Sequence, residues 1–151
     1  MRHVDERPPL ETYANFEVAV GIGSVAIGLL LILAPNTQLF DSYNSTIAQA
    51  FWQMESLSSE AMRMNHWLLA TCGAGVVGWG ITWAVIAHIP FRAGETWAWK
   101  CLFVSLVVWV LLDICCALWF GVTGEVAFVL VALFVGIVPL LLATKHLGRD
   151  T

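Results

Sequence analysis

Charged side chains are scarce in this 151-residue chain and are missing from its longest stretches. Asp, Glu, Lys and Arg make up 12% of the residues, whereas apolar residues make up 59% and the mean hydropathy is +0.78. This composition excludes an ordinary soluble domain. The chain also lacks any cluster of more than two or three Lys and Arg residues, so we expect no nucleic-acid partner.

The residue groupings of redox and metal enzymes are missing too. The cysteines Cys72, Cys101, Cys115 and Cys116 contain no Cys-x-x-Cys pair, and a buried thiol in apolar surroundings reacts slowly. No His, Cys and carboxylate residues follow a recognisable ligand spacing, so we expect no metal site and no cofactor. Whether Cys72 is ever bridged to Cys115 or Cys116 stays open.

Four apolar stretches are each long enough to cross a bilayer, at about 17–21 residues and 1.5 Å of rise per residue. They run Val18–Ala34, Trp67–Ala87, Cys101–Phe120 and Val126–Thr144. The sequence therefore predicts an all-α integral membrane protein, built as an antiparallel four-helix bundle in a single membrane domain over residues 1–151.

The expected segments follow from these stretches and from the breaks between them. They are a cytoplasmic leader (1–16), a first membrane helix (17–35), an outer loop (36–58), a second membrane helix (59–89), a cytoplasmic turn (90–96), a third membrane helix (97–120), an outer turn (121–124), a fourth membrane helix (125–145) and a tail (146–151). Because the leader is polar, we expect the first helix to be retained rather than cleaved as a signal. Pro8-Pro9 is expected to keep the leader extended.

The outer loop carries helical signals of its own. Its apolar residues recur at helical spacing around Ile47 and Phe51, with Thr46-x-x-Gln49 as a capping box. We expect a short amphipathic helix that lies on the outer interface as a lid. Ser58 or Ser59 is the expected N-cap of the second membrane helix.

Lys and Arg are distributed unevenly between the two sides. Six of the seven lie on one side (Arg2, Arg7, Arg92, Lys100, Lys145 and Arg149) and only Arg63 lies on the other. The positive-inside rule therefore places both termini and the second connection in the cytoplasm.

Asp113 is the first candidate for chemistry, because it lies in the outer half of the third membrane helix. A carboxylate there costs at least about 2.5–3.5 kcal/mol unless it is paired, hydrated or protonated. Arg63, Asn65 and His66 at the head of the second helix are expected to reach towards it, and Glu125 lies at a similar height. Two interpretations remain open: an acid/base pair of Asp113 and Glu125 beneath the lid, or a structural hydrogen bond that fixes helix register.

Most of the tryptophans are expected to anchor the protein at the membrane interfaces. Trp79, Trp83 and Trp109 lie within spans instead, where they face lipid or line a ligand cavity. The candidate ligand-binding residues are thus Trp109, Trp83, Trp79, His66, Asn65 and Arg63.

Small or polar residues recur on one face of each span and are expected to pack the helices together. In the second span this stripe is Thr71, Gly75, Gly78 and Thr82. At the inner border of the first span, Glu17 is expected to form an ion pair with Arg92.

A family resemblance covers the region from Asn65 to Pro139. It is carried by GVVGWGITWAVIAHIPFRAGETWAWK (Gly75–Lys100), by Trp109-x-x-x-Asp113, and by Gly121 followed by IVPLLL. The chain resembles the small bacterial four-helix membrane proteins of the DoxX-like kind. The resemblance implies the fold and a bacterial inner membrane but transfers no activity. In that family an Asn often stands where this chain has Glu125, which implies that Asp113 matters more than Glu125.

The sequence leaves the function open between two classes. The first is a non-catalytic membrane protein that binds a lipophilic molecule, or that serves as an accessory or scaffold subunit of a membrane complex or as a homo-oligomer. The alternative is a small membrane enzyme that acts on a quinone, isoprenoid or lipid with Asp113 as general acid/base. A channel or transporter component fits less well, because broken helices in paired repeats are missing.

Overall fold

The computed structural model describes residues 8–147, and within that range the chain forms helices and connecting turns but no β-strand. The helices in chain order are α1 (Pro8–Leu33), η1 (Gln38–Phe40), α2 (Asp41–Trp52), α3 (Ser59–Ile86), the π-helical turn η2 (Ala87–Phe91), α4 (Thr96–Phe120), α5 (Gly124–Ala143) and η3 (Thr144–His146). Four helices of the described range are long and apolar enough to cross a membrane: α1, α3 with η2, α4, and α5 with η3.

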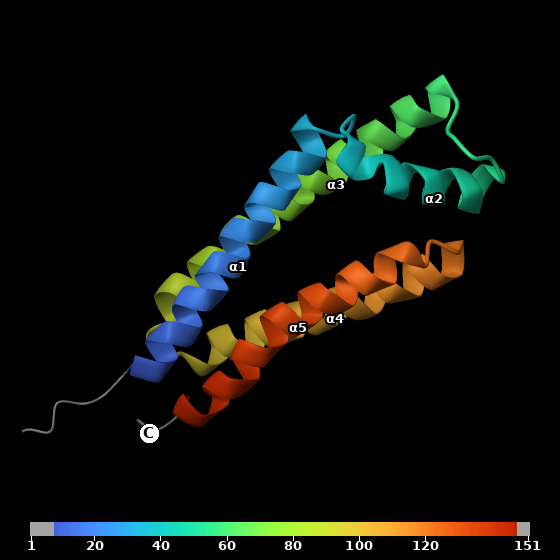
Figure 1. Cartoon of the computed structure of the whole chain (residues 1–151). Coiled ribbons are helices and arrows are strands. Elements are labelled where there is room, and N and C mark those ends of the chain that lie inside the picture. The colour runs from blue at the N-terminus through green and yellow to red at the C-terminus, as the bar shows by residue number, and fades with distance from the viewer. Residues whose placement is uncertain (1–7, 148–151) are drawn as a thin grey trace, which may run out of the picture.

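The long helices form two antiparallel pairs, α1 with α3 and α4 with α5 (Figure 1). The pairs meet at one end of the molecule, where α1 begins, α3 turns into α4 and α5 ends. We call this the narrow end. Towards the other end the two pairs diverge, and α2 lies between them there. We call this the wide end.

The α1–α3 pair is held by a seam with one small residue in every seven. The seam consists of Ala14, Gly21 and Gly28 on α1, of Gly80 and Gly73 on α3, and of Ala87 at the start of η2. A Cβ atom built on Gly21 would lie 2.7 Å from the carbonyl oxygen of Gly80, and one built on Gly28 would lie 2.6 Å from that of Gly73. The two backbones therefore touch, as small residues permit in membrane helices.

The face of α3 that packs against α1 differs from the face that the sequence predicted. The expected stripe of Thr71, Gly75, Gly78 and Thr82 is exposed, and a Cβ atom on Gly75 or Gly78 would meet nothing within 4 Å. That prediction was wrong. The helix carries two faces of small residues, and the face with Gly73 and Gly80 is the one that contacts Gly28 and Gly21 of α1.

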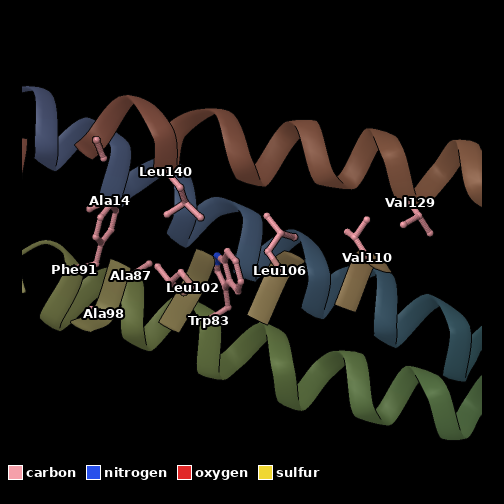
Figure 2. Packing of buried hydrophobic residues seen from close by; sticks show 11 residues of the cluster. Ala14, Trp83, Ala87, Phe91, Ala98, Leu102, Leu106, Val110, Val129 and Leu140 are labelled. Atoms are coloured by element: carbon pink, nitrogen blue, oxygen red, sulfur yellow. The ribbon is translucent and has the colours of Figure 1, made fainter. Parts of the chain in front are cut away.

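The hydrophobic core lies mainly between the two pairs, from the narrow end to the middle of the molecule. Figure 2 shows Trp83 of α3 beside Leu102 and Leu106 of α4, with Leu140 of α5 pointing into the same layer. These four side chains are at most 2% exposed. This packing joins the pairs where they approach each other.

Helix ends follow local chemistry, with two departures from expectation. α1 begins at Pro8, inside the segment expected to be an extended leader, because proline suits the first turn of a helix. α2 begins at Asp41, so Thr46 lies inside it and is no cap; its hydroxyl donates to the Ser42 carbonyl at 2.9 Å. The cap at Ser58 is confirmed, since its Oγ accepts from the Ala61 N–H at 3.2 Å.

The predicted helix in the outer loop is confirmed as α2, with Ile47 and Ala48 buried. The expectations for Arg2, Arg7 and Arg149 lie outside the described residues.

Candidate functional site

Polar side chains from four helices come together at the wide end. Tyr43 of α2 is half-buried there, and burial, followed by the charges of Glu125, Cys72 and Asp113, raises the pKa of Tyr43 to about 12. These charges act on Tyr43 from α5, α3 and α4 respectively. We call Tyr43, Cys72, Asp113 and Glu125 the wide-end cluster.

The structure thus brings Asp113 and Glu125 to the same region beneath α2, as the acid/base interpretation requires. Both carboxylates are half-buried. Asp113 lies one helical turn from Trp109 on α4, and Glu125 lies in the first turn of α5. Whether the two residues exchange protons with a substrate stays a prediction.

The head of α3 is arranged differently from what we expected. Asn65 is 6% exposed and donates from Nδ2 to Oδ1 of Asn44 at 2.8 Å, so it holds α2 onto α3 instead of reaching Asp113. Arg63 is exposed, and no ion pair in the described range joins it to Asp113. The Nε2 atom of His66 is buried without a hydrogen-bond partner.

The three tryptophans within spans form one aromatic row. The ring centroids of Trp79 and Trp83 are 4.9 Å apart, and those of Trp79 and Trp109 are 5.8 Å apart. The row joins α3 to α4, two turns along α3 from Cys72 and one turn along α4 from Asp113. It therefore extends from the hydrophobic core, to which Trp83 belongs, towards the wide-end cluster.

Tyr43 is the residue that sequence reasoning missed. A signal was present, because Tyr43 precedes the buried Ile47 by four residues and so shares its helix face. The apolar residues of α2 predicted this helix, and Tyr43 is a polar residue on the same face.

The predicted ion pair of Glu17 and Arg92 was wrong. Arg92 bonds instead to Glu11 in an exposed pair. Glu17 is fully buried, and its Oε2 accepts a hydrogen bond from Nε1 of Trp83 at 3.0 Å. Glu17 lies on the face of α1 towards α3, whereas Arg92 lies past the end of η2 beside the first turns of α1.

An open depression of about 400 Å³ lies on α2 and the loop after it, lined by Ser45, Gln49, Gln53, Met54 and Glu55. Trp109 and Asp113 do not line it. Within residues 8–147, no group of three or more His, Cys, Asp and Glu side chains is placed to hold a metal ion. The four cysteines are free thiols.

Comparisons with known proteins leave the resemblance to DoxX-like proteins as a prediction. No family model, no curated protein and no solved structure matches this chain.

Proposed function

We propose that this chain is a multi-pass protein of the bacterial inner membrane that binds a lipophilic molecule at the wide end, beneath α2. In this proposal the four long helices cross the membrane as an antiparallel bundle, with both termini in the cytoplasm and the wide end in the outer leaflet. The length and apolar composition of these helices support the insertion, and the excess of Lys and Arg on one side supports the orientation.

The observation that carries the proposal is the wide-end cluster itself. An apolar membrane protein has placed a phenol, a thiol and two carboxyl groups, from four helices, around one region. Polar groups inside membrane helices are costly and mark ligand or ion pathways by default. Trp109 lies one turn along α4 from Asp113 and its ring is 5.8 Å from that of Trp79, so aromatic surface for a lipophilic molecule lies next to the polar groups.

The proposal is tested by extracting whatever molecule accompanies the protein. The protein is purified in mild detergent, and bound lipophilic molecules are quantified by mass spectrometry of an organic extract. We expect one species near equimolar ratio in the wild type. In Asp113→Asn we expect a loss of about tenfold, because a hydrogen bond to a charged group contributes about 1.5 kcal/mol and about 1.4 kcal/mol corresponds to a factor of ten.

Matched controls separate the site from a general change of charge. Asp41→Asn removes an exposed acid at the start of α2, and Glu55→Gln removes an exposed acid after α2; both should retain the molecule. Equal recovery from Asp113→Asn and the controls, with an unchanged melting temperature, would contradict the proposal. A protein that co-purifies and tolerates Asp113→Asn would favour the accessory-subunit alternative.

One observation favours the second candidate, a membrane enzyme. Tyr43, Asp113 and Glu125 act on one another, so a hydroxyl donor and two carboxyl groups are available for proton transfer at one place. The extracted molecule is returned to purified protein and followed for chemical conversion by mass spectrometry. Conversion by the wild type and its loss in Asp113→Asn, with the molecule still bound, would establish the enzyme; a molecule bound unchanged would exclude it.

A further inference from the structure

A buried carboxyl group on α1 lies outside the wide-end cluster. Glu17 has an exposed fraction of 0%. Its Oε2 accepts from the indole N–H of Trp83 at 3.0 Å, whereas its Oε1 is buried and has no hydrogen-bond partner. Buried polar atoms are nearly always paired, so an orphaned carboxyl oxygen needs a physical explanation.

No cation in the described range neutralises this group. The titratable and charged residues near this level, on α1, η2 and the end of α5, are Glu11, Tyr13, His88, Arg92, Lys145 and His146. At the N-terminal end of α4, which packs on Trp83 through Leu102, Glu95, Lys100 and Cys101 are exposed. Arg92 bonds to Glu11, and the ring of His146 packs against Tyr13. His88 and Lys145 are exposed. Those farther along α3 and α5 (Arg63, His66, Cys72 and Glu125) lie towards the wide end.

A bound proton accounts for this arrangement. An ionised carboxylate without a cation is very costly in an apolar interior, and one indole N–H does not compensate for the loss of water. If Oε2 is the carbonyl oxygen that accepts from Trp83, the hydrogen resides on the unpartnered Oε1. A neutral acid so placed leaves one O–H donor unsatisfied, which costs much less than a full buried charge.

The Glu17 carboxyl group lies within the α1–α3 seam, so the loss of its proton affects the packing of these two helices. Along α1, Glu17 lies between the seam residues Ala14 and Gly21, and Trp83 of α3 lies between Gly80 and Ala87, the first residue of η2. The backbones touch in this seam, so water cannot enter without a separation of the helices. When the O–H bond breaks, the electron pair stays on Oε1 and the proton passes to water, and the carboxylate must then be hydrated.

We propose that Glu17 is a proton-binding site within the α1–α3 seam, and that release of its proton separates α1 from α3 next to Trp83. This site does not depend on the lipophilic ligand, so the two proposals fail or succeed separately. It gives the helix pair a proton-linked opening in its narrow half.

Infrared spectroscopy of the purified full-length protein tests the bound proton directly. We expect the carbonyl-stretch band of a protonated carboxyl group near neutral pH. The band should shift when the protein is labelled with [13C]glutamate, vanish in Glu17→Gln and persist in the control Glu125→Gln. Only carboxylate bands from the labelled glutamates, or a protonated glutamate band that keeps its full intensity in Glu17→Gln, would overturn the proposal.

A second variant covers the case in which Glu17→Gln does not fold. Trp83→Phe removes the indole donor and keeps an aromatic ring, so the carbonyl stretch of Glu17 should move to higher frequency. A band that is unchanged in Trp83→Phe belongs to another residue and would overturn the assignment.

The linked opening has its own readout. The melting temperature of the wild type should fall as the pH rises above neutral. Hydrogen exchange of the α1 and α3 amides near Glu17 and Trp83 should accelerate at least tenfold beyond the intrinsic base-catalysed rise of amide exchange with pH. Glu17→Gln should show neither the fall in melting temperature nor this additional acceleration. A pH dependence that is the same in both proteins would overturn the coupling between proton release and helix separation.

Discussion

The two helix pairs of this protein are packed by different means. In the α1–α3 pair, glycines let the backbones touch, and the groups that would obstruct an added Cβ atom are mostly backbone atoms. In the α4–α5 pair, a Cβ atom on Gly136 would meet only the side chain of Leu106, at 3.0 Å. A hydrogen bond from Nε1 of Trp99 to the Leu140 carbonyl, at 2.8 Å, adds a polar link there.

This difference shows how a small membrane protein can combine a rigid pair with an adaptable one. Between membrane helices, association depends on packing and hydrogen bonds because lipid is as apolar as the helix surface. A backbone contact allows no side-chain adjustment, whereas a leucine can change rotamer. We therefore infer that α1 and α3 behave as one unit while Glu17 holds its proton, and that α4 and α5 can shift against each other.

The largest expected effect comes from a clash in the α1–α3 seam. Gly80→Val should destabilise the protein by roughly 3 kcal/mol, at the upper end for overpacking, because its Cβ atom would lie 2.7 Å from the Gly21 carbonyl oxygen. Thermal unfolding in detergent measures the loss. Gly78→Val is the matched control on the exposed face of the same helix, and equal losses in the two variants would refute the seam.

Glycine-to-alanine substitutions, which add a single methyl group, compare the rigidity of the two helix pairs. Gly136→Ala should cost about 1 kcal/mol, because the flexible Leu106 side chain can yield. Gly80→Ala introduces the same methyl group against backbone and should cost more. Melting temperatures of both variants test the ranking, and a reversed order would show that α4–α5 is the rigid pair.

A smaller effect follows from the polar link of the α4–α5 pair. Trp99→Phe removes the hydrogen bond to the Leu140 carbonyl and should cost about 0.6 kcal/mol, as is usual for such bonds between membrane helices. Trp97→Phe is the control, since Trp97 is exposed. Denaturant or thermal unfolding of the two variants should differ by this amount, and no difference would mean that the bond contributes nothing.

The smallest expected effect is a change in the pKa of Tyr43, which reports how close the charges of α4 and α5 lie to α2. Removing a nearby charge with Glu125→Gln should lower the pKa of Tyr43 from about 12 towards its ordinary value of 10.0, and Asp113→Asn should lower it less. Because folding raises this pKa, the associated stability is fully present below pH 10 and is lost as the pH rises through about 12.

Tyrosinate absorbance during an alkaline titration follows Tyr43, with Tyr43→Phe to identify its signal. Since the sequence contains two tyrosines, the subtraction leaves one. A Tyr43 titration that neither variant changes would place the charges of α4 and α5 farther from α2 than the wide-end cluster requires.

The sequence predicted the helices far better than their faces. Hydropathy and length predicted four long apolar helices and the short α2, and the Ser58 cap followed from local capping chemistry. The sequence predicted that Gly75 and Gly78 pack against a neighbouring helix, whereas Gly73 and Gly80 make the contact with α1. Helical periodicity identifies faces of small residues, but the neighbour decides which face is used.

The sequence predicted only part of the candidate site, because the helix faces that meet there could not be predicted. Asp113 and Glu125 stood out because charges are rare within apolar stretches, and their similar height brought them to one region. Tyr43 and the bond of Glu17 to Trp83 could not be ranked from the sequence, because each depends on the rotation of a helix about its axis.

The order of the residues alone determined that this chain is helical and apolar enough for a membrane, since hydropathy and helix length are local properties. Only the tertiary structure decided which glycines carry backbone contacts, which carboxyl group is fully buried and which helices converge on Tyr43. Those features depend on the relative rotation and separation of helices, and these are set by the fit of whole surfaces rather than by any one segment.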